Sequence, residues 1–479
     1  MPHSHTLPPL SDHWQAVINE GWEQDVLPQL PDEAEQQAQQ LGAFLRHRQF
    51  RHASDLLRGL LAYVLCAGSF RQLGSWAVLI GLANLSHVAW RAHLRTARAW
   101  LLWLLCELLA VSASPAQQPS PQTPRILLID ATRLKQPGGT GDDWRVHLGY
   151  ELVSGRLVEV RVADRHTCEG FELFTLGPGD LVIADRGYSR RRQLAWALDQ
   201  GAQVLVRLEV QKVPLLDEQG QPLDVVAWLR AAQGVSQSRT VTFESGGQRY
   251  EGRLIAGVLP PEAAERARAK ARRQASKQQR QLKEQTLFLA GWVLLFCSLP
   301  QSTWSDALVL KLYRARWQIE LLIKRMKSVL KLAQLRGKTA LTNEATILAL
   351  LVCWALQQQE AQQARALLEQ VRSHVVSLVP DADSASQDPC VLPQLTDEPS
   401  EPVVSSWRLS TLGVQTLRCA VQGSWTFTRL HECLPYLSRY LCERRRRRHQ
   451  QERTIRRQLL SHLSATASES SRVFLCSSA

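Results

Sequence analysis

Hydrophobic positions along the chain predict helices in its first quarter. Up to about Val111, apolar residues recur at helical spacing through Leu56–Leu65 and again through Trp76–Leu108. Residues 69–74 are predicted to form a turn between helices, and residues 85–100 mix apolar positions with histidine and arginine. A helix–turn–helix that binds DNA has this pattern, but so does an ordinary basic amphipathic helix, and the pattern alone favours the ordinary helix.

The middle of the chain has the pattern of an α/β sheet. A continuous apolar run ends in Asp130, and a second such run ends in Asp185. Further strands, with a hairpin turn at Ser154-Gly155, are predicted over residues 145–152, 156–163 and 202–208, and helices over residues 169–175 and 189–200. This order of strand, hairpin, helix, strand and helix predicts one open sheet.

The two acids at strand ends are candidate ligand-binding groups. Open α/β sheets bind ligands at the carboxyl ends of their strands, so Asp130 and Asp185 would face one crevice if their strands are neighbours. For a single aspartate at a strand end, a helix cap or an ion pair is the more common explanation. For two such acids in one sheet, ligand binding and a purely structural role are about equally favoured.

Residues 304–332 form the strongest helix candidate, with a polar stripe that borders its apolar face. At about 100° per residue, four side chains fall within an arc of about 60°: Tyr313, Arg316, Glu320 and Lys327. Charged faces of helices normally lie opposite the apolar side, so this stripe needs partners. They are either a metal and phosphates or a partly buried Arg316–Glu320 ion pair.

These residues together resemble a known family. The spacing Tyr313-x2-Arg316-x3-Glu320-x6-Lys327 matches the Y-R-E-K signature of DDE transposases of the insertion-sequence-four family. Asp130-Ala-Thr132 resembles the first aspartate motif of that family, and the residues from Asp185 to Tyr188 resemble its D-x-G-Y/F motif. The resemblance is strong from about residue 125 to 338 and holds only in outline outside that range.

The resemblance implies a fold and a metal-dependent chemistry. The expected fold class is α/β, a ribonuclease H-like catalytic core with a β-rich insertion, flanked by helical N- and C-terminal regions. Asp130, Asp185 and Glu320 are the implied catalytic, metal-binding carboxylates. Two Mg²⁺ ions, which Mn²⁺ is expected to replace, would stabilise charge on the attacking and leaving oxygens of a phosphodiester.

Other residues are expected to contact DNA. Tyr313, Arg316 and Lys327 would act on phosphates beside the metals. Residues 266–283 carry eight basic side chains and no acid, which favours phosphate contacts from a helix that includes Arg272 and Arg273. A returning strand is predicted from Leu287, and its Trp292 resembles the tryptophan that stacks on a flipped base in hairpin-forming relatives. A core tryptophan is an equal alternative.

Charge and composition agree with a nucleic-acid partner. The 57 Lys and Arg exceed the 44 Asp and Glu by 13 charges, a weak indication by itself. The ten cysteines contain no C-x-x-C pair, the N-terminus has no signal-peptide pattern, and the longest apolar runs (99–111 and 345–356) are too short to span a membrane. We therefore expect a cytoplasmic protein with reduced thiols and no membrane partner.

The sequence thus predicts a transposase that binds the inverted ends of an insertion sequence, cleaves them and transfers the 3′ ends to target DNA, as a homodimer on double-stranded DNA. One alternative is a transposase-derived protein that binds DNA without cleaving it, which the three acids disfavour; another is a ribonuclease H-like nuclease without strand transfer.

The predicted domains are residues 1–111 (helical, DNA-binding), 112–124 (linker), 125–345 (catalytic core, insertion at about 203–299), 346–372 (helical extension), 373–407 (acidic, Pro-rich connector) and 408–479 (helical and basic, with five arginines at 444–448).

Overall fold

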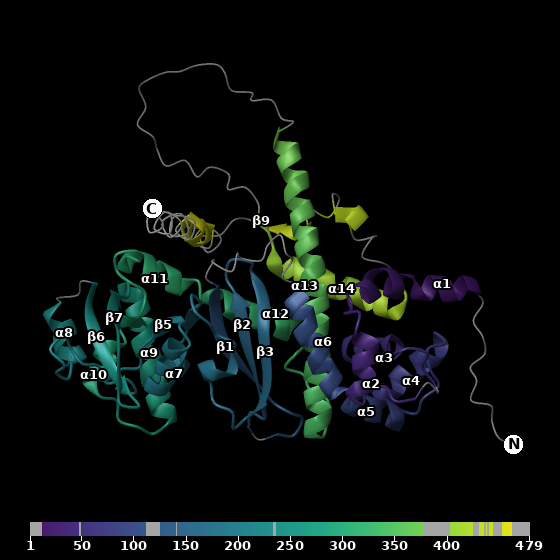
Figure 1. The fold of residues 1–479 in the computed structure, drawn as a ribbon, viewed down its shortest axis with the longest axis horizontal. Helices are drawn as coiled ribbons and strands as arrows, with labels where there is room; N and C mark the ends of the chain where they lie inside the picture. The colour runs from purple at the N-terminus through teal and green to yellow at the C-terminus, as the bar shows by residue number, and fades with distance from the viewer. Residues whose placement is uncertain are drawn as a thin grey trace, which may run out of the picture. The chain divides into compact units, whose positions relative to one another are not determined.

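The computed structural model describes most of the chain as two compact units (Figure 1). The described residues are 12–46, 49–111, 125–139, 141–232, 236–377, 403–424, 431–434, 437, 440–443 and 453–461. Unit 1 joins residues 1–115, 133–144 and 322–451, and unit 2 joins residues 116–132, 145–321 and 452–479. Neither unit is one continuous stretch of sequence, and the division falls inside a single helix, α12 (Trp317–Val329).

An eight-stranded sheet forms the framework of unit 2. Its strand order is β3-β2-β1-β4-β5-β8-β7-β6. The strands are β1 (Ile126–Leu134), β2 (Trp144–Glu151), β3 (Arg156–Asp164), β4 (Leu181–Ala184), β5 (Gln203–Arg207), β6 (Gln237–Ser245), β7 (Gln248–Val258) and β8 (Trp292–Cys297). Strands β1, β4 and β5 run parallel, whereas β8, β7 and β6 each pair antiparallel with the preceding neighbour. This mixed sheet confirms the predicted α/β class with a ribonuclease H-like core.

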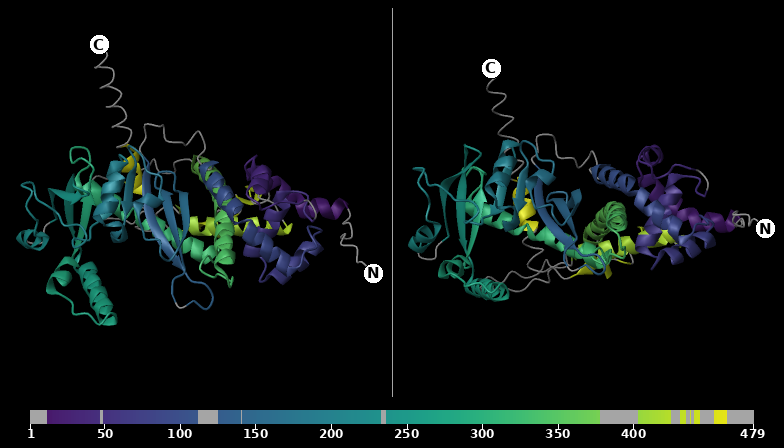
Figure 2. Two further views of the ribbon diagram at one scale, coloured as in Figure 1. Left: turned by 60° about the horizontal axis from the view of Figure 1, so that its bottom comes forward. Right: turned by 90° about the horizontal axis from the view of Figure 1, so that it is seen from below.

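Helices and turns of unit 2 connect these strands. They are α7 (Arg191–Asp199), α8 (Val225–Ala231), α9 (Pro261–Lys277), α10 (Glu284–Leu289) and α11 (Asp306–Arg314), with short 3₁₀ turns η3 (Phe171–Leu173) and η4 (Arg186–Tyr188). An apolar core that includes Phe171, Tyr188, Phe243 and Phe296 is buried against the sheet. In the left panel of Figure 2, α9 is the helix at the lower left, set apart from the strands.

Several predicted elements of unit 2 differ from the structure. The helix predicted over residues 169–175 is only the 3₁₀ turn η3, because its seven residues include Gly170 and are too few to sustain an α-helix. The strand predicted to return to the core at the end of the insertion does so, since β8 pairs with β5 and carries β7 and β6 beside it. The returning strand begins at Trp292, not Leu287, because residues 284–289 form α10.

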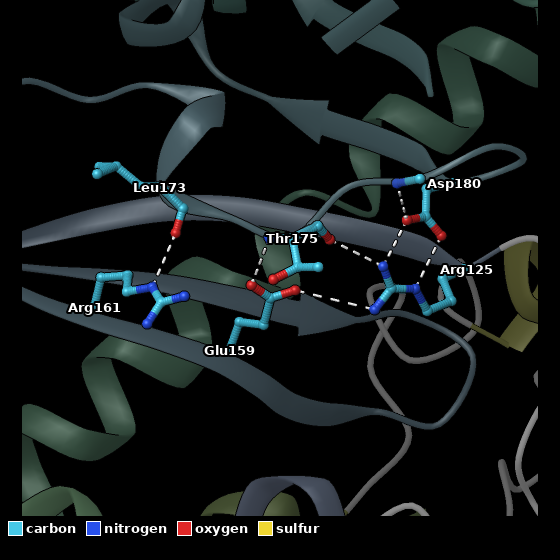
Figure 3. A network of polar contacts seen from close by, with 7 residues as sticks. Arg125, Glu159, Arg161, Leu173, Thr175 and Asp180 are labelled. Atoms are coloured by element: carbon cyan, nitrogen blue, oxygen red, sulfur yellow. Dashed lines mark hydrogen bonds and ion pairs between the residues drawn. The ribbon is translucent and has the colours of Figure 1, made fainter. Parts of the chain in front are cut away.

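A polar network fixes the start of the first core strand (Figure 3). Arg125 donates from Nε and Nη2 to the two carboxylate oxygens of Asp180, at 2.9 and 2.5 Å, and from Nη2 to the carbonyl of Thr175 at 3.0 Å. Glu159 on β3 accepts from the Thr175 amide at 2.9 Å and lies 4.0 Å from Arg125. Charge-assisted, two-point contacts of this kind set the register in which β1 and β4 run side by side.

Unit 1 is built around one long helix, α13 (Ala340–Ser377), which contacts α3, α5, α6 and α14. The other elements of unit 1 include α1 (Asp12–Gly21), α2 (Ala34–Gln40), α3 (Ala53–Leu65), α4 (Phe70–Leu79), α5 (His87–Thr96), α6 (Arg98–Val111), α14 (Ser406–Gln422) and the strand pair β9 (Val403–Val404) and β10 (Cys442–Glu443), with the short turns η1 (Trp22–Val26) and η2 (Leu27–Gln29). Among the described residues, only α13 is long and apolar enough to cross a membrane, and 83% of its apolar window is buried, as in a core helix.

The turn predicted at residues 69–74 is wrong. Residues 70–79 form α4, and Ser69 caps its N-terminus by accepting a hydrogen bond from the Gln72 amide at 3.3 Å. Serine is a strong N-cap residue, so the same residue that suggests a turn here begins a helix. The linker 112–124, most of the connector 373–407 and residues 444–448 lie outside the described residues.

The single helix predicted over residues 304–332 is two helices. α11 ends at Arg314 and α12 begins at Trp317, with a turn at residues 315–316. There the amides of Ala315 and Arg316 bond to carbonyls three residues back, at 2.9 and 3.2 Å, which is the tighter 3₁₀ geometry. Residues before and after this turn therefore do not share one continuous helical stripe.

Candidate active site

Three parallel strands bring three ionisable side chains to one level of the sheet. Ile129 on β1 pairs with Ala184 on β4, and Ala184 pairs with Val206 on β5. The next residue on each strand is Asp130, Asp185 and Arg207 respectively. Because parallel strands advance together, these three side chains emerge side by side at the carboxyl end of the pairing, where open sheets bind ligands.

Asp130 differs from the prediction in one respect. It was expected at the end of its strand, but β1 continues to Leu134. It is β4 that ends, at Ala184, so the parallel pairing stops where the two aspartates begin. The predicted proximity of Asp130 and Asp185 therefore arises from the end of the neighbouring strand.

Arg316 links the sheet to the α12 helix. Its Nη1 lies 3.5 Å from Asp130 Oδ2, and its Nη2 donates a hydrogen bond to Glu320 Oε1. The side chains of all three residues are largely buried, with exposures of 18% for Arg316, 20% for Asp130 and 28% for Glu320. The Arg316–Glu320 ion pair that the sequence left as an alternative is therefore present. The same guanidinium of Arg316 also forms an ion pair with Asp130.

The electrostatics of Asp130 are those of a crowded carboxylate. Burial raises its pKa to about 6, and the charges of Asp185 and Glu320 act in the same direction. A 2.8 Å hydrogen bond from the Ala131 amide and the charge of Arg316 oppose the rise. Neighbouring carboxylates repel one another unless a cation neutralises them, so this site favours positive charge.

Asp185 also caps the turn that follows it. Its Oδ1 accepts a hydrogen bond from the Gly187 amide at 2.7 Å, which closes the 3₁₀ turn η4. The cap interpretation is thus correct for this residue, and it does not exclude a ligand. A carboxylate fixed by a backbone amide is pre-oriented for any further bond that it makes.

Tyr313 and Arg207 lie near the same group of carboxylates. Burial raises the pKa of the Tyr313 hydroxyl, and the charges of Arg316 and Arg207 lower it. Burial lowers the pKa of Arg207, and the charges of Arg186 and Arg316 act in the same direction. Two guanidinium groups, one phenol and three carboxylates therefore face one region of unit 2, a combination that can bind both a cation and a phosphate.

The donor set fits a hard divalent cation. Carboxylate oxygens are the ligands that Mg²⁺ and Mn²⁺ prefer. Burial, and after it the charges of Asp185 and Glu320, raise the pKa of Asp130, and a cation would oppose this shift. In the described part of the chain, no three Asp, Glu, His or Cys side chains gather at coordination distance. The guanidinium of Arg316 bridges Asp130 and Glu320 and supplies the neutralising charge there.

Lys327 lies two turns beyond Glu320 on the same face of α12. Its Nζ lies 3.5 Å from the carbonyl oxygen of Arg133. Burial lowers its pKa, and the charge of Asp142 partly offsets this. Its phosphate contact stays a prediction.

Trp292 is buried in the core. It begins β8, only 6% of its surface is exposed, and its ring centroid lies 6.3 Å from that of Phe288. This placement favours the core interpretation that the sequence left open. Stacking on a flipped base would require the side chain to leave this environment, and it stays a prediction.

Replacing Trp292 by Ala should therefore destabilise the protein strongly. Loss of a buried tryptophan leaves a cavity in the core, and we expect a decrease of about 3–5 kcal/mol in the free energy of unfolding, measured by denaturant titration. Trp14, whose side chain is 58% exposed, provides the control. A Trp292→Ala protein as stable as the Trp14→Ala protein would contradict the core role and favour an exposed function for the ring.

Arg272 and Arg273 lie on α9, which ends at Lys277 and does not continue to Lys283 as predicted. Both side chains are exposed. Arg272 forms an ion pair with Glu265 at 3.4 Å, whereas the Arg273 Nε donates to the Ala269 carbonyl at 3.4 Å. None of the contacts that they form within the described ranges joins them to the carboxylate site, so they belong to a separate basic surface.

Sequence reasoning missed two residues near the carboxylates, Glu169 and Arg207, and it named Tyr188 only as part of the D-x-G-Y match. Arg207 could have been found, because it is the last residue but one of the strand predicted over residues 202–208, and strand ends are where ligands bind. Glu169 was predicted to begin a helix over residues 169–175, and no local spacing could place its carboxylate beside the other acids.

Comparisons with known proteins show which proteins the chain is similar to. The family model described as transposase DDE domain matches residues 121–356, a range that contains all three carboxylates. Transposase InsL of insertion sequence element IS186A from Escherichia coli strain K12 is 34% identical over 345 residues, which cover 71% of this chain and 91% of that protein. The transposase of insertion sequence element IS421 from Escherichia coli is 34% identical over 346 residues, with the same coverage.

Proposed function

The chain belongs to the DDE transposases, and on that premise we propose that it binds the inverted ends of an insertion sequence, cleaves them and transfers the 3′ ends to target DNA. The observation that carries the proposal is the convergence of Asp130 and Asp185 on adjacent strands with Glu320, joined through Arg316. Three acids with a guanidinium among them suit metal-dependent phosphodiester chemistry.

We propose Mg²⁺ as the physiological ion, with Mn²⁺ as a substitute. Members of this family use divalent metal ions in general. Asp130, Asp185 and Glu320 would hold the metal, which when bound would supply Lewis-acid stabilisation of the scissile phosphate. The Gly187 amide keeps the Asp185 carboxylate in one orientation, and the hydrogen bond from the Ala131 amide does the same for Asp130.

The basic and phenolic residues would act on the phosphate. With Asp130 and Glu320 holding a metal, the guanidinium of Arg316 would be free to pair with phosphate oxygens, a bidentate contact for which arginine is well suited. Tyr313 would donate its hydroxyl hydrogen bond to a neighbouring phosphate oxygen. Lys327 would contact the backbone of the same strand further along α12.

A second DNA contact is proposed on α9. Its basic side chains stand on a helix with one buried residue, Ala264, which leaves most of the helix surface to solvent. Part of the charge is neutralised within the helix, because Arg266 pairs with Glu262, and Arg268 and Arg272 both pair with Glu265. Arg273, Lys277 and the residues just beyond them form no ion pair within the described residues, so they are free to bind phosphates.

Changing α9 should alter the salt dependence of DNA binding. Replacing Arg273 and Lys277 together by Ala is expected to reduce the slope of log K against log salt by about 2, since each phosphate contact contributes close to 1. The measurement is fluorescence anisotropy on duplex DNA at several salt concentrations. Gln274→Ala, an exposed neutral neighbour on the same helix, is the control. An unchanged slope in the double variant would show that α9 does not bind DNA.

Three further proposals concern the DNA-binding region, the oligomeric state and the cellular location. We propose that the helical N-terminal region, residues 1–111, binds the element end, and that the active complex is a homodimer, because one protomer holds one end and two ends must be joined. A cytoplasmic location is proposed because DNA is the substrate and the longest apolar helix is mostly buried.

Cleavage of end DNA tests the proposal. Short inverted repeats that flank the gene would identify the ends. Labelled duplex from such an end should be nicked at its border by the full chain with Mg²⁺ or Mn²⁺, and not in EDTA. Cleavage that persists in EDTA, or equal cleavage of unrelated duplex, would contradict the proposal. The alternative of a nuclease without strand transfer rests on no specific observation here.

A further inference from the structure

A fourth acid, Glu169, lies against the loop that carries Asp185. A Cβ added to Gly187 would be 2.1 Å from Glu169 Oε2 and 3.0 Å from Asp185 Oδ1. Both carboxylate oxygens therefore lie within 3.0 Å of one point above the Gly187 backbone. The glycine in this position leaves the space that the Glu169 carboxylate occupies, because any larger residue would collide with it.

The segment around Glu169 is fixed by the core. The Phe171 amide donates to Gln193 Oε1 on α7 at 2.6 Å, and both residues are buried. The Phe171 ring packs against Tyr188 with ring centroids 5.3 Å apart. Glu169, two residues before Phe171, is thus held beside η4 by packing and a buried hydrogen bond.

The hydroxyl of Tyr188 is buried in the same place. The side chain has no exposed surface, and the hydroxyl has no hydrogen-bond partner among the described residues. Burial raises its pKa well above the usual value, and the charges of Asp130, Glu169 and Asp185 act in the same direction. A buried donor costs about 1–3 kcal/mol when its bond is not made, so its presence beside three carboxylates indicates a partner at this point.

Arg145 is a cation whose charge acts on this group. Its charge lowers the pKa of Tyr188, and its Nη1 donates to the Thr167 carbonyl at 2.7 Å. It forms no ion pair with Glu169 within the described part of the chain. Glu169 itself forms no hydrogen bond or ion pair with a described residue, so its charge is not neutralised by the protein.

We propose that Glu169 is a fourth carboxylate of the divalent-cation site, binding the cation on the Asp185 side. The Tyr188 hydroxyl, which has no partner among the described residues, would act as a positioning residue by donating to one of these carboxylates when the cation is bound. This inference rests on the proposed function, because it extends the site of Asp130, Asp185 and Glu320. The charge of Glu169 and its closeness to Asp185 match what a hard cation requires.

The test is Mn²⁺ binding by the full chain on end DNA, followed by electron paramagnetic resonance of free Mn²⁺, with nicking measured against Mn²⁺ concentration in parallel. Glu169→Gln keeps the shape and removes the charge. We expect its Mn²⁺ affinity to fall by about 10- to 100-fold, with nicking recovering at high Mn²⁺. Tyr188→Phe, which removes only the hydroxyl, should weaken Mn²⁺ binding in the same direction.

Glu172→Gln is the matched control, since Glu172 is exposed and only three residues away. It should bind Mn²⁺ as the wild type does. A Glu169→Gln protein with wild-type Mn²⁺ affinity, or one that loses only thermal stability, would overturn the inference. If instead the wild type neither binds Mn²⁺ nor nicks end DNA, the proposed function itself fails. If Glu169→Gln misfolds, Glu169→Asp keeps the charge and must retain tighter Mn²⁺ binding than Glu169→Ala.

Discussion

Asp130→Asn, Asp185→Asn and Glu320→Gln should each lower the rate of end cleavage by about 10³-fold or more. Each change keeps the shape of the side chain and removes one charge of the proposed metal site, and a bound metal would contribute several kcal/mol of transition-state stabilisation. Because the three residues are proposed to hold one metal site, their effects should not add. The double variant Asp130→Asn/Asp185→Asn is expected to be about as slow as either single variant.

These variants should remain folded and bind DNA. The three acids repel one another and the DNA phosphates, and burial already raises the pKa of Asp130 to about 6. Removing one charge should therefore leave end-DNA affinity within a few-fold of wild type or increase it, measured by anisotropy. Glu251→Gln, on the exposed surface of β7, is the control for the charge change alone. Cleavage near the wild-type rate in any one variant would remove that residue from the site.

Arg316→Ala should have the second-largest effect. Arg316 contacts both Asp130 and Glu320 and is the proposed phosphate ligand once metal has bound. Loss of a charge-stabilising donor at a reacting group typically costs about 10²–10³-fold in rate, and we expect that range at saturating Mg²⁺. Arg316→Lys should recover little, because an ammonium cannot make the two-point contact of a guanidinium.

The control for Arg316 is Arg314→Ala. Arg314 is exposed at the end of α11, two residues earlier in the chain. Its loss should leave cleavage nearly unchanged, although both variants lose one positive charge. If Arg316→Ala melts at a much lower temperature and its folded fraction cleaves at the wild-type rate, Arg316 serves only as an ion-pair partner.

The sequence predicted the residues of the candidate site from motif order, and the structure brings several of them together for partly different structural reasons. The polar stripe was drawn on one helix, but the chain turns at residues 315–316. Arg316 nevertheless reaches Glu320, because both follow the start of that turn and are only one turn apart. Asp130 was placed at a strand end, yet it lies within β1, and its closeness to Asp185 comes from the strand register.

The contacts between residues that are far apart in the sequence could not be predicted from local sequence patterns. Glu169 meets the Asp185 loop because Phe171 is anchored to Gln193 on α7, and neither hydrophobic period nor residue spacing carries that information. The insertion gives a similar lesson. Its strands were predicted from alternation, but their addition to the core sheet depends on β8 pairing with β5, a contact between residues about 90 positions apart.

Strand transfer is the measurement that tests the central claim most directly. The purified chain, labelled DNA of the element end and a supercoiled target plasmid are incubated with Mg²⁺, and the products are separated on a denaturing gel. A transposase built on Asp130, Asp185 and Glu320 should join the labelled 3′ end covalently to the plasmid, and Glu320→Gln should give no joined product. Efficient cleavage of the end without any joined product, in wild-type protein bound to both DNAs, would contradict the account and identify the chain as a nuclease.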